Sequence, residues 1–364
     1  MFSPSKPLER LFVNAGILII FWAINCIMKN ARALFVSLLS TITLIAYGQT
    51  PSVEILTSGT KTSLRGLSVV NENIIWVSGS NGSVGKSVNG GKSWSWMKVN
   101  GFEKSEFRDI EGFNGNVAVI LAIGEPAHIL KTTDGGQSWK VVYENKTKGM
   151  FLDAMDFADN QKGMIIGDPI NGKVFIATTE DSGNTWQEYS NPPAADSGEA
   201  FFAASGTNLR YFGKDDFYLV SGGTKSRLMT GKTTTSLDLL QGLESTGANS
   251  IDLYDPTGKR IIIVGGDFAK DSITGGNCLY TTNGGKTWKK PEVPPHGYRS
   301  CVEYLSKKAL LACGINGVDY SSNGGRTWTW ISKEGFNVCR IARVGSAVYL
   351  AGNNGKIARL TWSK

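Results

Sequence analysis

One eight-residue pattern occurs five times in this chain of 364 residues and sets the period of the rest. It reads [S/T]-x-[D/N]-x-G-x-[S/T]-W, and its second copy, at 132–139, is Thr-Thr-Asp-Gly-Gly-Gln-Ser-Trp. An Asp or Asn side chain can accept backbone N–H bonds inside a turn, and glycine adopts positive φ there without steric cost. We therefore expect five tight turns, each followed by a strand, at 87–94, 132–139, 179–186, 281–288 and 321–328.

The spacing of the copies indicates the architecture. Their closing residues, Trp94, Trp139, Trp186, Trp288 and Trp328, lie 45, 47, 102 and 40 residues apart. A period of about 40 to 50 residues with four short strands per unit is typical of propeller blades. The double gap predicts one blade that has lost the pattern, and a worn copy lies midway, at 230–237.

Four strands, a to d from the centre outward, can be traced in each unit. We expect them at 64–70, 74–78, 83–87 and 94–99 in the first unit, and at 107–112, 117–123, 128–132 and 139–143 in the second. Later inner strands are expected near Leu152, Phe201, Ile251, Cys301 and Cys339. The seventh unit, 338–362, lacks strand d, which the spare strand 53–56 can supply so that no sheet edge stays exposed. The sequence therefore predicts an all-β fold, a seven-bladed β-propeller closed by its N-terminal strand. Six blades would require the fourth unit to be an insertion.

The repeated turns resemble the Asp-box, or BNR, repeat of sialidases and other β-propellers. Beyond the leader, the chain is similar to the propellers grouped with photosystem II stability/assembly factors, whose blades read F-R-x-[I/V] and T-x-D-G-G-x-T-W, as at 107–110 and 133–136. It looks closer still to an exported, Bacteroidetes-type branch often labelled oxidoreductase, on segments 167–169, 198–207, 265–268 and 297–300. The resemblance implies a binding or assembly role. No G-x-G-x-x-G stands in a βαβ setting, so we expect no flavin, haem or nicotinamide cofactor.

Residues 1–48 are expected to be a leader, and residues 49–364 a single propeller domain. The basic stretch 28–32, the apolar stretch 33–45 and the small residues Ala46 and Gly48 match the three regions of a secretory signal peptide. We expect translation to begin at Met28, cleavage between Gly48 and Gln49, and an exported protein, periplasmic or extracellular. The alternative is an uncleaved leader that forms a membrane hairpin, since 11–28 is about long enough to span a bilayer.

The charge of the chain gives little support for nucleic-acid binding. Of the net charge of +7, three charges belong to residues 1–48, and no run of Lys or Arg stands in the remainder. We expect a monomer whose partner is a protein or a glycan, and membrane contact only through an uncleaved leader.

Export would place the cysteines in an oxidising compartment. Cys26 lies in the leader, and Cys301 and Cys313 lie on neighbouring strands of one expected hairpin, which makes them the pair best placed for a disulfide. The alternative is that they are free thiols in the core. No C-x-x-C or Cys/His cluster indicates a metal, so we predict no metal site.

The d–a and b–c connections of a propeller open on one face, and the repeated turns lie on the other. Charged and aromatic residues gather on the first face, at the starts of inner strands and in the b–c loops. The candidate ligand-binding residues are Arg65, Arg108, Glu125, His128, Asp153, Asp168, Glu199, Asp267, Tyr298 and Arg299. Because arginine pairs bidentately with carboxylate or phosphate, we expect a protein, anionic or glycan ligand on this face.

Two functions fit these residues. The first is an exported, non-catalytic binding or assembly propeller. The second is a carbohydrate-active enzyme, a glycosidase or lyase, with Asp168, Glu199 and Asp267 as candidate acids and bases. A typical sialidase is disfavoured because its Phe-Arg-Ile-Pro signature is absent. For any single residue the alternative is that arginines and carboxylates neutralise one another in a hydrated channel and serve stability alone.

Overall fold

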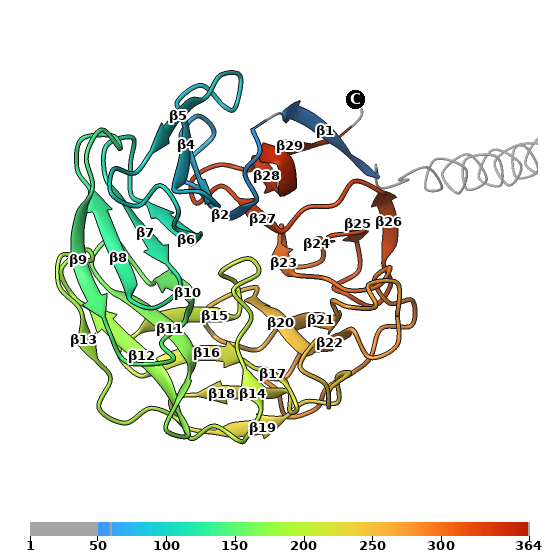
Figure 1. The fold of residues 1–364 in the computed structure, drawn as a ribbon. Coiled ribbons are helices and arrows are strands. Elements are labelled where there is room, and N and C mark those ends of the chain that lie inside the picture. Colours follow the sequence, from blue (N-terminus) through green and yellow to red (C-terminus); the bar gives the residue numbers. More distant parts are fainter. Residues whose placement is uncertain (1–49, 59, 363–364) are drawn as a thin grey trace, which may run out of the picture. The chain divides into compact units, whose positions relative to one another are not determined.

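A computed structural model describes residues 50–58 and 60–362; the leader and cleavage site predicted for residues 1–49 lie outside this part of the chain. The described residues form seven sheets around a common centre, with one 3-10 turn, η1 (Asn353–Gly355), as their only helical element (Figure 1). No helix in the described ranges is long and apolar enough to cross a membrane. The predicted all-β, seven-bladed propeller is confirmed.

Each of the first three blades is an antiparallel sheet of four strands in chain order. Blade one holds β2 (Leu64–Val69), β3 (Ile75–Gly79), β4 (Ser83–Ser87) and β5 (Ser95–Lys98). Blade two holds β6 (Phe107–Gly112), β7 (Ala118–Ala122), β8 (Ala127–Thr132) and β9 (Lys140–Asn145). Blade three holds β10 (Leu152–Phe157), β11 (Gly163–Ile170), β12 (Lys173–Thr179) and β13 (Gln187–Glu188).

Blades four and six follow the same plan, whereas blade five has only the single bridge between Tyr280 and Lys289 in place of a fourth strand. Blade four holds β15 (Leu209–Gly213), β16 (Asp216–Val220), β18 (Arg227–Thr230) and β19 (Thr234–Ser236). Blade five holds β20 (Thr246–Leu253), β21 (Ile261–Asp267) and β22 (Cys278–Thr281), and the short strands β14 (Glu199–Ala200) and β17 (Gly222–Gly223) extend its sheet beyond β20. Blade six holds β23 (Cys301–Tyr304), β24 (Leu310–Gly314), β25 (Gly317–Ser321) and β26 (Thr329–Ser332).

The first and last strands of the described chain close the ring. Blade seven holds β27 (Val338–Ile341), β28 (Val348–Ala351) and β29 (Ile357–Trp362), and its fourth strand is β1 (Pro51–Thr57). β1 runs antiparallel to β29 from the pair Pro51/Trp362, and Val53 packs against the core of blades six, seven and one. The predicted closure by the N-terminal strand is confirmed.

The five repeated patterns form one kind of turn between strands c and d. In the second copy, the hydroxyl of Thr132 donates to Asp134 (2.8 Å) and accepts the N–H of Gly136 (2.9 Å), while Asp134 accepts the N–H of Ser138 (3.0 Å). Gly136 has a φ of 91°, which glycine adopts without strain. The worn copy in blade four keeps only a turn closed by the hydroxyl of Thr230, which accepts the N–H of Thr233 (2.9 Å).

The hydrophobic core lies in the seams between neighbouring blades. The closing residue of the second pattern, Trp139, packs edge-to-face on Trp76 of blade one at 6.5 Å between ring centroids. Near the centre, polar side chains of one inner strand accept N–H groups of the next. Asp109 accepts from Met155 (2.9 Å), and Asp252 accepts from Tyr304 (2.6 Å). Buried N–H groups that would lack a partner are satisfied in this way.

The inner strand of blade four lies further along the chain than the sequence predicts. That strand is β15, whereas the expected position, Phe201, belongs to a loop. We name residues 201–208 the channel loop, because it projects toward the middle of the ring (Figure 1). The alternation of buried Leu209 and Tyr211 with the less buried Arg210 is typical of a strand. The run Phe-Phe-Ala-Ala-Ser-Gly has no such alternation, so the prediction near Phe201 is wrong.

Candidate functional site

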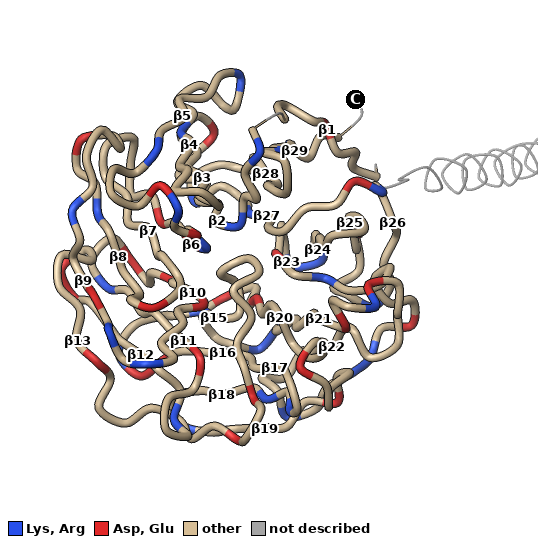
Figure 2. The backbone as a smooth tube through the Cα atoms, viewed as in Figure 1, with Lys and Arg blue, Asp and Glu red and all other residues tan. Residues whose placement is uncertain are grey.

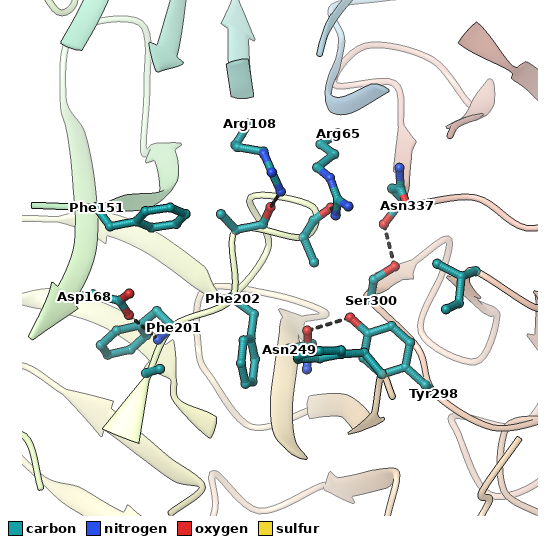
Figure 3. Close-up of a pocket in the computed structure, with 15 residues that line it drawn as sticks. Arg65, Arg108, Phe151, Asp168, Phe201, Phe202, Asn249, Tyr298, Ser300 and Asn337 are labelled. Atoms are coloured by element: carbon teal, nitrogen blue, oxygen red, sulfur yellow. Dashed lines mark hydrogen bonds between the residues drawn. The ribbon is translucent and has the colours of Figure 1, made fainter. Parts of the chain in front are cut away.

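A pocket of about 470 Å³ opens where the starts of inner strands meet the b–c connections, over the channel loop (Figure 3). It lies on the face predicted for a ligand. Two arginines, one aspartate, four residues with an amide or hydroxyl group and eight apolar residues line it. These residues are Arg65, Arg108, Phe151, Asp168, Ala200, Phe201, Phe202, Ala203, Ala204, Asn249, Phe268, Tyr298, Ser300, Ile315 and Asn337.

In six of the seven blades, one residue occupies an equivalent position at the start of the inner strand. In four blades this residue is left out of the pairing between strands a and b by a bulge; these residues are Arg65, Arg108, Asp153 and Asn249. A β-bulge re-aims a side chain, and three of these four line the pocket. The same position is filled by Ser300 in blade six and Asn337 in blade seven, which also line it.

The two pocket arginines reach across the channel to the channel loop. Arg65 donates to the carbonyl oxygen of Ala204 (3.3 Å) and Arg108 to that of Ala203 (3.2 Å) (Figure 3). Burial and the charge of Arg108 lower the pKa of Arg65 to about 10. Each guanidinium carries five N–H donors, so both keep donors for a ligand. The buried Nε of Arg108 has no hydrogen-bond partner.

The channel loop closes the bottom of the pocket. The hydroxyl of Ser205 donates to the carbonyl oxygen of Ser300 (2.7 Å) in blade six, and that of Thr207 donates to Ser250 (2.7 Å) in blade five. With the two arginine contacts, four blades hold this loop. A ligand therefore meets a fixed floor of Ala203 and Ala204, both buried.

Aromatic rings form the wall opposite the arginines. Phe268 packs edge-to-face on Phe202 (5.7 Å between centroids) and on Tyr298 (6.3 Å). The Tyr298 hydroxyl donates to Asn249 (2.8 Å), and burial raises the pKa of this phenol, so it stays a neutral donor. Phe268 is 44% exposed, which leaves an apolar ring face free for a ligand.

Two aspartates stand at the side of blade three. Asp168 lines the pocket and accepts the N–H of Phe201 (2.9 Å), and burial raises its pKa. Asp153 lies beneath, fully buried, and neither of its oxygens has a hydrogen-bond partner. Burial and the neighbouring Asp168 raise the pKa of Asp153 well above its ordinary value, although Arg108 opposes this shift. Burial of a carboxylate without partners favours its neutral form.

Arg299 does not lie in the pocket, because its place on the inner strand differs by one residue from that of Arg65. The N–H of Leu64 donates to Gly352 of the preceding blade, as the N–H of Arg299 does to Gly265. Arg299 is therefore the counterpart of Leu64, and a shift of one residue moves a strand side chain to the opposite face. Its guanidinium is fully buried and forms an ion pair with Asp319, to which Nε donates at 2.6 Å.

The carboxylates of Glu199 and Asp267 are held by contacts within the fold. Glu199 is buried, forms an ion pair with Arg227 and accepts the hydroxyl hydrogen of Ser221. Asp267 is 3% exposed and accepts the N–H of Ala269 (2.9 Å) at the start of a b–c loop. Neither lines the pocket, so the two carboxylates predicted to act with Asp168 are not brought to it.

Glu125 and His128 also lie away from the pocket lining. Glu125 accepts the N–H of Gly149 (3.0 Å) and fixes the loop between blades two and three. His128 lies 3.2 Å from the Glu144 carboxylate and packs edge-to-face on Phe102. Of the ten predicted residues, the pocket lining therefore includes Arg65, Arg108, Asp168 and Tyr298, with Asp153 behind them.

Sequence reasoning missed the channel loop. It also missed three uncharged pocket residues at the starts of inner strands. Asn249, Ser300 and Asn337 carry no charge to attract notice, but aligning the seven inner strands on their buried positions would have found them. Of the two alternatives for Cys301 and Cys313, the structure has free thiols: the two residues are paired neighbours on β23 and β24, and both are buried.

Charges of both signs are spread around the ring (Figure 2). Below the channel loop, arginines and carboxylates other than the pocket residues pair with one another. Arg210 donates to Asp252 (2.9 Å) and Glu303 (3.1 Å), and Arg340 approaches Glu303 to 3.5 Å. Burial and the nearby charge of Asp252 raise the pKa of Glu303 to about 8. This buried network links blades four to seven around the channel, while Arg65 and Arg108 line the pocket.

Comparison with known proteins agrees with this architecture. A sequence model of the family described as photosynthesis system II assembly factor YCF48 matches residues 49–149. None of the curated proteins compared matches the chain. A solved structure described as YCF48 bound to D1 peptide superimposes with a TM-score of 0.62 at 18% identity, over 86% of this chain and 96% of that one.

Two further structures share the fold. YCF48 from Cyanidioschyzon merolae gives a TM-score of 0.61 at 16% identity, over 85% of this chain and 99% of that one. The GH74 enzyme of Niastella koreensis gives 0.56 at 15% identity, over 84% of this chain but only 53% of the enzyme. Identities this low establish the fold and no more. Taken with the sequence match over blades one and two, they show that the chain is similar to the photosystem II assembly factors and shares their propeller fold.

Proposed function

We propose that this protein is a non-catalytic binding propeller that holds an exposed segment of a partner protein in the pocket over the channel loop. The observation that carries the proposal is the division of the pocket into two sides. Arg65 and Arg108 lie on one, and the exposed ring of Phe268 with Tyr298 lies on the other. Such a site suits a peptide that carries an acidic group next to an apolar side chain.

The similarity to assembly-factor propellers supports a protein partner over a glycan. One solved propeller of this fold is described as bound to a peptide. In the present chain the channel loop blocks deep entry, so a ligand would lie across the pocket and contact several blades at once. That arrangement favours an extended chain segment over a compact small molecule.

The carbohydrate-active alternative has less support from the geometry. Hydrolysis of a glycosidic bond ordinarily uses two carboxyl groups on either side of the bond. Within the described residues, Asp168 is the only carboxylate that lines the pocket. Glu199 is bound to Arg227, and Asp267 is buried in its own loop. The likeness to the GH74 enzyme therefore supplies a fold without a matching acid pair.

A peptide array tests the proposal. Purified mature protein is probed with short peptides that differ in acidic and aromatic content. Arg65→Ala and Arg108→Ala are compared with Arg326→Ala, whose guanidinium is exposed on the outer edge of blade six and pairs with Glu292. We expect acidic-aromatic peptides to bind, and the two pocket variants alone to lose binding. Equal binding by all three variants would refute the site, and turnover of any glycan in a parallel panel would favour the enzyme.

We also propose that the protein is exported after cleavage between Gly48 and Gln49. The support is the signal-like composition of 28–48 and a propeller that begins with β1 shortly after that point. Mass spectrometry of the mature N-terminus in fractionated cells would test it. A mature chain that starts before Gln49 would contradict the proposed cleavage.

A further inference from the structure

Three cysteine thiols meet in the seam between blades six and seven. Cys301 on β23, Cys313 on β24 and Cys339 on β27 place their Sγ atoms within 4.8 Å of one another. The Sγ atoms of Cys301 and Cys339 are 3.7 Å apart, and all three residues are fully buried. The fourth cysteine of the propeller, Cys278, is also buried but stands outside this group.

The spacing matches that of a metal-thiolate centre. With metal–sulfur bonds of about 2.3 Å, three sulfurs in a plane around one ion lie about 4 Å apart. The backbone N–H of Cys339 points to Cys301 Sγ at 3.4 Å. A hydrogen bond of this kind stabilises a sulfur that carries negative charge, and partners outside the ligand set tune metal sites in this way.

The surroundings discriminate between metals. A zinc ion would take four ligands, yet among the described residues no His, Asp or Glu completes the group. Full burial in a core that includes Leu311, Val318 and Phe336 leaves no opening for a coordinating water. A soft ion that accepts three thiolates fits this donor set, and thiolate ligands select copper(I).

A positive charge stands nearby. Arg340 follows Cys339 on β27, directly after a ligand of the proposed site. The residues of one strand therefore supply both a ligand and a compensating charge.

We propose that Cys301, Cys313 and Cys339 form a three-coordinate site for a soft monovalent metal ion, copper(I), which ties blade six to blade seven. Blade seven is the blade that β1 completes, so the ion would fasten the ring beside its closure. This site is separate from the pocket over the channel loop and does not depend on the function proposed for it.

Copper(I) binding by the full mature chain tests the proposal. The ion is supplied anaerobically as its acetonitrile complex to the folded protein, and as copper salt to the culture during expression, because the thiols are buried. Bicinchoninate then competes for the metal. We expect one copper to stay with each chain, with a raised melting temperature because the ion binds the folded state. Failure of both loading routes would overturn the proposal.

Variants locate the ion. Cys301→Ser, Cys313→Ser and Cys339→Ser should each release copper to the chelator, whereas the matched variant Cys278→Ser should retain it. Retention by the three cluster variants would overturn the site. Should those variants fail to fold, X-ray absorption of the wild-type protein decides. Three sulfurs at about 2.3 Å support the site, and two sulfurs or any nitrogen or oxygen ligand contradict it.

Two other outcomes are also decisive. Retention of zinc(II) in four-coordinate form in place of copper would contradict the selectivity argued from burial. Peptide mapping that finds Cys301 linked to Cys339 in protein isolated from its own compartment would show a disulfide in place of a metal site.

Discussion

Gly206, near the tip of the channel loop, lies against the carboxylate of Asp109 on the inner strand of blade two: a Cβ added at Gly206 would overlap both carboxylate oxygens. The φ of Gly206 is 67°, in the region that favours glycine. Asp109 cannot move away freely, because it also accepts the N–H groups of Ile110 (2.8 Å) and Met155 (2.9 Å). The loop that forms the floor of the pocket is thus positioned by a contact that only glycine permits.

We therefore expect Gly206→Ala to displace the channel loop. The free energy of unfolding should fall by more than about 1 kcal/mol, because alanine is strained at this φ and also clashes. The control is Gly172→Ala, where φ is 73° but nothing lies within 4 Å of the added carbon. Urea unfolding of both variants separates the two causes. Equal losses would show that backbone strain alone is responsible.

The buried ion pair of Arg299 predicts a loss of stability without a change in binding. Arg299→Ala leaves Asp319 buried without its charged partner, which costs about 3–5 kcal/mol. Arg65→Ala removes one contact to a loop carbonyl and should cost only about 1 kcal/mol. Denaturant titration measures both. A small effect of Arg299→Ala would mean that Asp319 finds another partner or a proton.

Because of Asp153, we expect the stability of the protein to fall as pH rises. A paired carboxylate would have the opposite effect. Its pKa in the folded protein is raised, chiefly by burial, so the folded state holds the proton more tightly than the unfolded chain, where the pKa is about 3.9. The wild type is therefore penalised increasingly as pH rises above about 4. Asp153→Asn should gain stability over the wild type at neutral pH, and the gain should vanish toward pH 4.

Asp134 in the second repeated turn supplies the contrast. Hydrogen bonds from Ser138 and Thr132 lower its pKa to about 2, so its contribution is present above the unfolded pKa of about 3.9 and is lost as pH falls toward 2. Asp134→Asn should therefore show no gain at neutral pH. Urea unfolding at several pH values checks both variants, and parallel profiles would refute the burial argument for Asp153.

We expect substitutions on the two faces of β1, the strand that closes the ring, to differ in their effect on stability. Val53 packs against the core, whereas Ile55 is 43% exposed. Val53→Asp should destabilise the protein by about 1–3 kcal/mol, because it buries a charge in the seam. Ile55→Asp should change stability little. Thermal unfolding measures the difference, and equal tolerance at both positions would mean that β1 contributes little to the ring.

Much of the fold could be predicted because each blade repeats a local rule. The Asp or Asn of each turn and the closing tryptophan act within a few residues, so their spacing alone gave the period and the missing seventh strand d. The channel loop could not be found in this way. Phe201 and Phe202 look like the start of a strand. Only the contacts of Gly206, Ser205 and Thr207 with other blades show that they begin a loop that closes the pocket.

The site was predicted less well, because register decides which side chains face the channel. Arg299 and Ser300 are adjacent, and nothing in the local sequence shows which of them corresponds to Arg65. The hydrogen bond from Arg299 to Gly265 of another blade shows that it is Ser300. Likewise, Glu199 is removed from the pocket by Arg227, a partner 28 residues away in sequence. Charge pairing at such distances is a property of the folded molecule.

The pairing of β1 with β29 also links closure of the ring to the order in which its strands are synthesised. Among the strands of the ring, the one that completes it is synthesised first, and its partner, Ile357–Trp362, is synthesised last. Until then β1 has no neighbour to pair with, and the circle stays open at one gap. A product that stops short of β29 therefore keeps two unpaired strand edges, which protein quality control can recognise and which mark the chain as unfinished.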